Sequence, residues 1–197
     1  MKNLAILKSY SYESYLQLSD DLLKNNGTTG NDQSEEHIKY TALNHTRMER
    51  WNKTLQLSEE LKQSLQELKI KMEWVVISES WCGDSAQIIP VLAKMEQESA
   101  GKISLKIILR DEHPVWIEKY HTDGKKSIPK LIAFDEAGNE LFVWGPRTTS
   151  AIQIFKDWKA QEASVPKSEF QNQLHLWYAR NKGLEIMEEI NTILKKL

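Results

Sequence analysis

Residues 74–90, WVVISESWCGDSAQIIP, join a short β-branched run to the only cysteine of the chain. The run WVVIS is typical of a buried strand, and the segment after the cysteine has apolar residues at helical spacing, with Pro90 where a kink is expected. Cys82 lies between the two, and a thiol beside a helix start can be a reactive thiolate. One thiol cannot close an intramolecular disulfide, so any redox cycle requires a second molecule.

Further strands and helices alternate after this stretch. ISLKIIL at residues 103–109 predicts a second strand, HPVWIEKY a short helix, PKLIAFD a third strand, and ELFVW a fourth strand after the turn EAGN. A helix is expected at about residues 149–159. The order predicts an α/β fold, with βαβ followed by ββα around a mixed sheet and helices on both faces.

The N-terminal part is predicted to be helical. Residues 12–24 place Tyr15, Leu18 and Leu22 at helical spacing, another helix is expected over residues 37–51, and Ser58 begins a third by capping it. Between the first two helices, NNGTTGNDQS breaks the pattern with glycine and polar residues. This stretch is expected to be a mobile loop.

After Pro166 the pattern predicts one long amphipathic helix that runs towards the end of the chain. Its apolar residues fall at three-, four- and seven-residue steps: Phe170, Leu174, Trp177, Leu184, Met187, Ile190, Leu194 and Leu197. Packing of this face on the chain's own core is the favoured interpretation. A homodimer through the C-terminal helix is the alternative.

Length and composition limit the classes of protein. At 197 residues the chain is expected to be one compact domain, with an N-terminal helical extension (1–69), a core (70–162) and a C-terminal helix (163–197). The net charge of -2 offers no basic surplus for nucleic acid, and no apolar run reaches the length of a signal peptide or a membrane span. A single cysteine agrees with a reducing compartment, so a cytoplasmic protein is expected. The histidines lack zinc-site spacing, so no metal is expected.

Residues of about 70 to 160 resemble the thioredoxin fold. In that family a central strand leads into a Trp-Cys-Gly-Xaa-Cys turn, a proline follows eight residues after the first cysteine, and a cis proline precedes the next strand. Here Trp81, Cys82 and Gly83 are followed by Pro90 at that distance, and Pro129 leads into the strand KLIAF. The chain also resembles a bacterial thioredoxin-like group that has helical additions before the motif and after the final helix.

The resemblance implies that Cys82 is the nucleophile, at the start of a helix that opens around Asp84. Gly83 would let the backbone turn tightly and approach a partner peptide, or it is a simple turn glycine. Asp84 stands where thioredoxin has proline. Its carboxylate can cap or charge-stabilise the first helical turn, and its negative charge opposes formation of a neighbouring thiolate. We therefore expect a weakly activated thiol. Ser85 replaces the second cysteine and could donate a hydrogen bond to the sulfur.

Val76 and Glu79 decide whether a buried acid lies near the cysteine. The buried acid that thioredoxin carries six residues before its first cysteine is Val76 here, so the family's proton acceptor for the second thiol is missing. Glu79 could replace part of that function, but a solvated side chain at the strand end is the favoured interpretation.

The substrate groove is expected beside the cysteine. By resemblance, Pro129 carries a cis peptide bond that faces Cys82, and the backbone of Ile128 pairs with an extended substrate. Trp81 is expected to flank the site as an exposed apolar platform.

Two functions remain open. The first is monothiol thiol–disulfide exchange, in which Cys82 attacks a disulfide, Ser85 assists, and an external small thiol or a reductase regenerates the protein. Its partners would be a disulfide-bearing protein or a low-molecular-weight thiol, with no bound cofactor, nucleic acid or membrane. The second is a redox-inactive adaptor that uses the thioredoxin fold to bind a protein. Ordinary dithiol thioredoxin activity is rejected.

Overall fold

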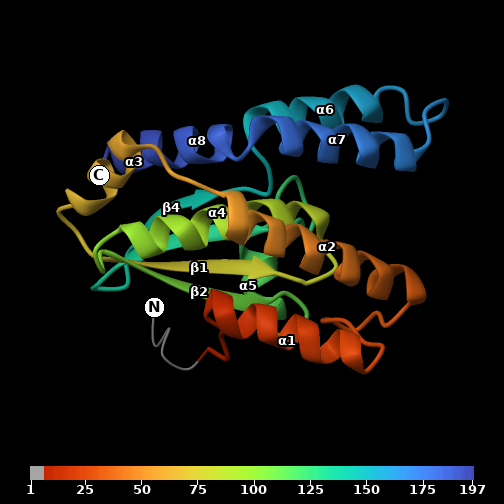
Figure 1. Ribbon diagram of the computed structural model, residues 1–197, viewed down its shortest axis with the longest axis horizontal. Coiled ribbons are helices and arrows are strands. Elements are labelled where there is room, and N and C mark those ends of the chain that lie inside the picture. Colours follow the sequence, from red (N-terminus) through yellow and green to blue (C-terminus); the bar gives the residue numbers. More distant parts are fainter. Residues whose placement is uncertain (1–6) are drawn as a thin grey trace.

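The computed structural model describes residues 7–197, which fold around a four-stranded mixed sheet (Figure 1). The strands, in the spatial order β2-β1-β3-β4, are β1 (Met72–Ser78), β2 (Ile103–Leu109), β3 (Lys130–Asp135) and β4 (Glu140–Trp144). β2 is parallel to β1, which requires a crossover, and helix α4 (Gly83–Glu98) supplies it. β3 is antiparallel to both β1 and β4. The predicted α/β fold is confirmed.

The central strand β1 is buried on both faces because successive side chains point to opposite sides of the sheet. Trp74 and Val76 belong to the larger hydrophobic cluster, which includes side chains of α4. Val75 and Ile77 belong to a smaller cluster on the other face, which also contains Cys82. The cysteine therefore emerges at the end of a strand that packing holds firmly on both sides.

Within residues 7–197, seven further helices surround the sheet. Serine side chains at positions 11, 34 and 58 cap the first three helices by accepting hydrogen bonds from backbone amides three residues ahead. Because Ser34 is one of these caps, the second helix begins at Glu35, two residues before the predicted start. The helices are α1 (Tyr12–Lys24), α2 (Glu35–Thr54), α3 (Glu59–Gln66), α5 (Pro114–Lys119), α6 (Thr149–Lys159), α7 (Lys167–Asn181) and α8 (Leu184–Leu194).

The loop at residues 25–34, which the sequence predicts to be mobile, is anchored at its centre. Thr28 and Thr29 are buried, and their hydroxyl groups lie within hydrogen-bond distance of Ser80 Oγ. Thr29 Oγ1 also accepts a hydrogen bond from the Ser80 amide at 2.8 Å. A buried backbone amide needs a partner, and this loop supplies it just before the WCGDS motif. The centre of the loop is therefore part of the structure around the motif, whereas its exposed residues 31–34 make no such buried contact with Ser80.

The C-terminal segment is two helices rather than the single long helix that the sequence predicts. The chain breaks between α7 and α8 at Lys182 and Gly183, which have positive φ angles of 54° and 76°. A left-handed residue at this position ends a helix. In Figure 1, α6, α7 and α8 run along one side of the molecule, beyond α4. Their apolar stripe packs within the chain, through Phe170, Leu174, Tyr178, Ile186, Met187, Ile190 and Leu194.

Residues 1–6, which include most of the apolar run judged too short for a signal peptide, lie outside the described residues. Among the helices of residues 7–197, none combines the length and the apolar character needed to cross a membrane.

The break at Gly183 can be tested against a glycine of the same backbone conformation. A Cβ added to Gly183 would lie 3.0 Å from Val91 Cγ2, whereas one added to Gly101, also at φ 76°, would meet nothing within 4 Å. We expect Gly101→Ala to lower the free energy of unfolding by ~1 kcal/mol through strain alone. Gly183→Ala should cost ~1–3 kcal/mol more because it overpacks the α4 contact. Equal losses in urea unfolding would contradict this role for Gly183.

Candidate functional site

Cys82 lies at the point where β1 meets α4. It is the N-cap residue of α4 and its side chain is 8% exposed. The thiol donates a hydrogen bond to the carbonyl oxygen of Ile128 at 3.4 Å, and the Ile128–Pro129 peptide bond is cis. The fold thus brings together the motif residues and the Ile128–Pro129 segment, which are separated by 46 positions in the sequence.

The thiol of Cys82 is held in its protonated form. Burial, followed by the nearby charge of Asp84, raises the pKa of Cys82 to about 11. The backbone amides of Asp84 and Ser85 at the helix start oppose this rise, as does the Ser85 hydroxyl. The direction agrees with the expectation of a weakly activated thiol, because the helix terminus does not compensate for desolvation.

Asp84 binds distant side chains in addition to lying in the first turn of α4, which it was expected to cap or stabilise by its charge. Its carboxylate is buried and accepts hydrogen bonds from Arg147 Nε at 2.9 Å and from the Tyr178 hydroxyl at 2.9 Å. Arg147 Nη2 lies 2.7 Å from the same carboxylate oxygen as Nε. Arg147 follows β4 and Tyr178 lies on α7. One carboxylate therefore connects the cysteine motif to two distant parts of the chain.

Ser85 is fully buried beneath the motif. Its Oγ atom forms no well-aligned hydrogen bond with any described residue, so the expected hydrogen bond to the sulfur is not formed in this arrangement. The hydroxyl nevertheless lies near enough to favour the thiolate form of Cys82. Ser85 can therefore assist the sulfur only by a rotation of its hydroxyl group.

Gly83 is required by the close approach of His175 on α7. A Cβ on Gly83 would lie 2.8 Å from Cε1 of the His175 ring. The ring is held from the other side, because Nδ1 accepts a 3.4 Å hydrogen bond from Gln87, whose carbonyl oxygen accepts from Trp51. Burial, with the nearby charge of Arg47, lowers the pKa of His175 to about 4. The imidazole is neutral at physiological pH.

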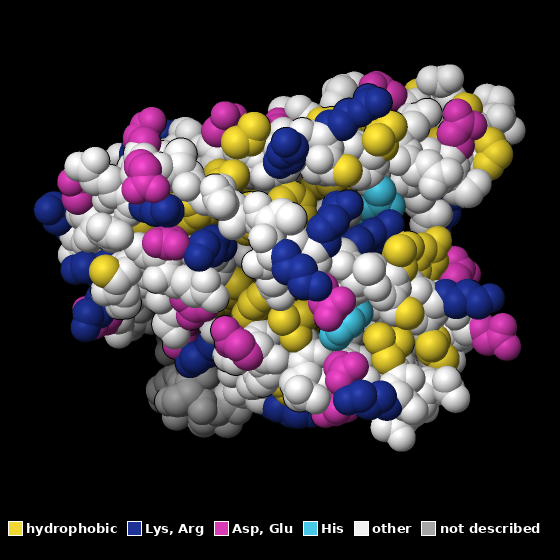
Figure 2. All heavy atoms as spheres, in the orientation of Figure 1, with side chains coloured by type: hydrophobic (Ala, Val, Ile, Leu, Met, Phe, Trp, Pro, Cys, Tyr) yellow, Lys and Arg dark blue, Asp and Glu magenta, His cyan; other side chains and the backbone are white. Residues whose placement is uncertain are grey.

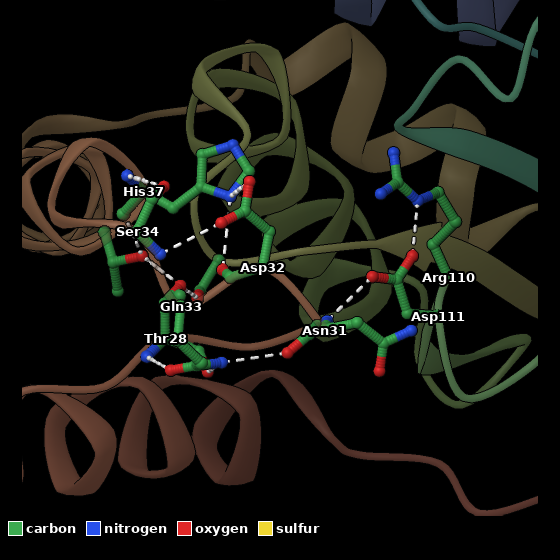
Figure 3. A network of polar contacts seen from close by, with 11 residues as sticks. Thr28, Asn31, Asp32, Gln33, Ser34, His37, Arg110 and Asp111 are labelled. Carbon is green, nitrogen blue, oxygen red and sulfur yellow. Dashed lines mark hydrogen bonds and ion pairs between the residues drawn. The ribbon is translucent and has the colours of Figure 1, made fainter.

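Trp81 is a partly buried wall of the site rather than the exposed platform that was predicted. Its ring stacks on His37 at 4.5 Å between centroids, and the Arg110 guanidinium lies 4.8 Å from its centroid. Figure 3 shows the polar contacts that position these two neighbours. Asp32 lies beside the His37 ring, and Asp111 binds both Arg110 and the backbone amide of Asn31. The N-terminal extension therefore builds one side of the site.

Glu79 is not the solvated residue that was favoured from the sequence. Its side chain is completely buried, and Oε1 accepts a hydrogen bond from the Asp111 amide at 2.9 Å. Burial raises the pKa of Glu79. The carboxyl group points to the loop at Gly30 and Asp111, so it supports the Trp81 wall. Val76, at the position of thioredoxin's buried acid, is fully enclosed among apolar side chains.

A pocket of about 210 Å³ opens over Cys82. The motif forms its floor, while α2 and α7 contribute walls that no thioredoxin motif predicts. Its lining includes His37, Tyr40, Trp81, Cys82, Gly83, Asp84, Arg147, Lys167, Phe170, Leu174 and His175. Sequence reasoning missed Arg147, His175 and Tyr178 because nothing in their spacing connects them to the motif. Within the described part of the chain, no group of three or more His, Cys, Asp and Glu side chains could hold a metal ion.

The strand order, the crossover helix and the cysteine opposite a cis proline define a protein of the thioredoxin-like class. A thioredoxin family model matches residues 30–159, which is more than half of the chain. The chain belongs to the thioredoxin family. The thioredoxin of Synechocystis sp. is 32% identical over 78 residues, which cover 39% of this chain and 70% of that protein.

Two solved structures have the same overall fold with little sequence identity. One is a protein of unknown function from Pseudomonas aeruginosa, with a TM-score of 0.56, 15% identity, and coverage of 95% of this chain and 98% of that one. The other is an HIV epitope scaffold, with a TM-score of 0.56, 14% identity, and coverage of 95% and 99%. Because 95% of this chain is covered, the shared fold includes most of the helical additions.

The effect of Asp84 on the thiol can be measured by alkylation. In the wild-type protein we expect the rate of reaction with iodoacetamide to rise with pH towards an inflection near 11. Asp84→Asn removes the charge and leaves Arg147 in place, so the thiol pKa should fall by about one unit and the rate at pH 8 should rise about tenfold. Loss of a charged hydrogen-bond acceptor should also cost ~1–3 kcal/mol of stability.

Glu36→Gln is the matched control for that experiment, because Glu36 lines the same pocket but is exposed. Its alkylation profile should follow the wild type. A wild-type inflection well below the value of about 8.5 for a free cysteine would contradict the assignment. So would an Asp84→Asn variant that reacts no faster than the wild type.

His175 should make the protein sensitive to acid. Because its folded pKa of about 4 is below the unfolded value of 6.5, the unfolded chain binds the proton first as the pH falls. Its contribution to stability is therefore complete above pH 6.5 and is lost progressively between pH 6.5 and 4. His175→Gln should flatten the curve of unfolding free energy in this range, whereas His121→Gln, at an exposed histidine, should not. Parallel curves for wild type and His175→Gln would refute this.

Proposed function

We propose that this protein is a monothiol thiol–disulfide exchange protein that acts through Cys82 with an external thiol as reductant. The observation that carries the proposal is that Cys82 lines a pocket at the N-terminus of α4, opposite the Ile128–Pro129 cis peptide bond. The free amides of that helix end are aimed at the position where a thiolate would form. Membership of the thioredoxin family supports the same chemistry.

The proposed exchange has two steps. The Cys82 thiol loses its proton to water, and its thiolate attacks one sulfur of a disulfide RSSR. A Cys82–S–S–R bond forms, the original S–S bond breaks, and RS⁻ leaves with the electron pair and takes up a proton. The thiolate of a second small thiol, R′SH, then attacks the R sulfur. The Cys82–S–S–R bond breaks, Cys82 leaves with the electron pair and takes up a proton, and the disulfide R–S–S–R′ forms.

An external thiol is necessary because the chain has no second cysteine. Ser85 occupies the place of the resolving thiol, and its hydroxyl cannot attack a mixed disulfide. With the pKa of Cys82 raised to about 11, only a small fraction of the thiol is ionised at neutral pH. The proposed exchange is therefore slow at pH 7 and accelerates as the pH rises.

A redox-inactive binding module is the second candidate. The same raised pKa favours it, since a thiol that stays protonated is a poor nucleophile. The cover of α7 over the motif also favours it, because Tyr178 and His175 fix that helix against Asp84 and Gly83. In this function the pocket would bind a partner without chemistry at Cys82.

We place the reaction in the cytoplasm, where small thiols are kept reduced and a single free cysteine is not oxidised. The oxidised partner would be a low-molecular-weight disulfide or a protein disulfide, and no bound cofactor takes part. The apolar stripe of the C-terminal helices packs within the chain, so it gives no reason to propose a homodimer.

Substitution of Cys82 tests the proposal directly. The wild type should accelerate reduction of the mixed disulfide of glutathione and 2-mercaptoethanol by glutathione, and Cys82→Ser should not, because a hydroxyl cannot replace the thiolate. In Ser85→Cys the added thiol should resolve the adduct, so that mass spectrometry after one equivalent of disulfide finds an internal disulfide instead of a mixed one.

The two candidate functions give different results. If the wild type shows no turnover with glutathione, cysteine or coenzyme A between pH 7 and 9, while folding normally, the binding module is preferred. Turnover that persists in Cys82→Ser would show that the assay reports another reaction.

A further inference from the structure

The pocket over Cys82 has positive charge that the protein does not balance. Lys167 lines the pocket and makes no ion pair with any residue in the range 7–197. Arg47 on α2 is not itself a lining residue, but it borders the pocket: its Nη1 atom lies 3.6 Å from the place that a Cβ on the lining residue Gly83 would occupy. Asp84 lies close enough for its charge to favour the ionised form of Arg47, but its two oxygens already accept hydrogen bonds from Tyr178 and Arg147.

Arg47 is the less usual of the two cations. It is partly buried, and the hydrogen bond that holds it runs from Nη1 to a neutral acceptor, Asn44 Oδ1, at 2.8 Å. Among the described residues no carboxylate forms an ion pair with it. A partly desolvated guanidinium without a carboxylate is unfavourable unless something else supplies the negative charge. Burial also lowers the pKa of Arg47, as expected for a cation that lacks such a partner.

The surface view supports this distribution of charge. Figure 2 shows Lys and Arg side chains gathered beside a histidine in the hollow where the C-terminal helices overhang the body of the molecule. The carboxylates that line the pocket are Glu36, which is exposed, and Asp84, which is already paired. The described lining therefore has no unpaired buried carboxylate that would repel an anion in the hollow.

We propose that the pocket binds a small disulfide or thiol that carries a carboxylate, and that Arg47 and Lys167 bind this carboxylate while the ligand's sulfur reaches Cys82. This inference rests on the proposed exchange activity and names its substrate class. A guanidinium is well suited to the carboxylate because its donors match the two oxygens of that group. The ammonium group of Lys167 adds a second charge from the opposite helix.

The size of the pocket favours a small ligand over an extended peptide. Its volume of about 210 Å³ is below the roughly 300–1,000 Å³ that is usual for sites of drug-sized ligands. Aromatic and apolar side chains, Tyr40 and Phe170 among them, complete the walls and lower the local dielectric constant on the Arg47 side, whereas Lys167 is exposed. Electrostatic attraction is stronger in such a site than at an open surface.

Three symmetrical disulfides that differ mainly in charge provide the test. The probes are 3,3′-dithiodipropionate (anionic), bis(2-hydroxyethyl) disulfide (neutral) and cystamine (cationic). The rate of mixed-disulfide formation at Cys82 is measured by mass spectrometry at pH 8.5 and low salt. To correct for the intrinsic reactivity of each probe, this rate is divided by the rate at which the same probe reacts with the model thiol N-acetylcysteine amide under the same conditions. The anionic probe should react at least about tenfold faster than the neutral one, and the cationic probe more slowly.

Arg47→Gln should reduce the preference for the anionic probe by about tenfold, and Lys167→Gln should reduce it by a smaller factor. Arg50→Gln is the matched control, because Arg50 is exposed on the same helix and loses the same charge. Its preference should stay at the wild-type value. The neutral probe reports on the integrity of the site, since a variant that only disturbs the fold changes both rates and leaves their ratio unaltered.

Each possible failure has a different meaning. If the wild type reacts with all three probes at the same normalised rate, the carboxylate site is refuted while the exchange function stands. The same holds if Arg47→Gln keeps the wild-type preference. If no probe reacts with the folded protein at pH 8.5, both the exchange function and this inference are refuted.

Discussion

The buried carboxylate of Asp84 is the interaction on which the site depends. A carboxylate removed from water is strongly unfavourable unless a cation and hydrogen-bond donors replace the solvent. Here the cation comes from Arg147, 63 positions further along the chain, and the donor from Tyr178, 94 positions further along. Arg147 comes from the loop after β4, whereas Tyr178 reaches the motif only because α7 lies over it. Half of the carboxylate's partners therefore come from the C-terminal addition, which couples the stability of that addition to the site.

The same carboxylate works against the reactivity of the thiol. A proline at this position, as in thioredoxin, has no charge, whereas Asp84 adds a negative charge next to a buried sulfur and raises its pKa further. Arg147 acts in the opposite direction only in part, because the same guanidinium is bound to the carboxylate. The arrangement holds α7 in place at the expense of thiolate formation. A thiol that is buried beside a carboxylate is a slower nucleophile at neutral pH than one without that charge.

The sequence predicts the local features of the site and misses its long-range contacts. β1 and the helix at the cysteine follow from patterns within a few residues, and the cis proline follows from the resemblance to thioredoxin; the structure contains all three. The partners of Asp84, the burial of Glu79 and the anchoring of Thr28 depend on contacts between distant segments, which periodicity and composition do not encode. Gly183 is an instructive exception. A glycine inside the predicted C-terminal helix was a visible signal of a break, and the apolar stripe on both sides of it concealed that signal.

The helical additions change the surroundings of the cysteine in this family member. In the core fold, the cis proline segment offers backbone groups to an extended chain, and such a contact does not depend on side chains of the partner. Here α2 and α7 surround the same cysteine with aromatic, apolar and cationic side chains. Walls of this kind discriminate by size and charge, because a ligand must fit between two helices that packing and the Asp84 contacts hold in place. In the proposed exchange, the core supplies the sulfur and the helix end, and the walls built by the additions limit which molecules can reach them.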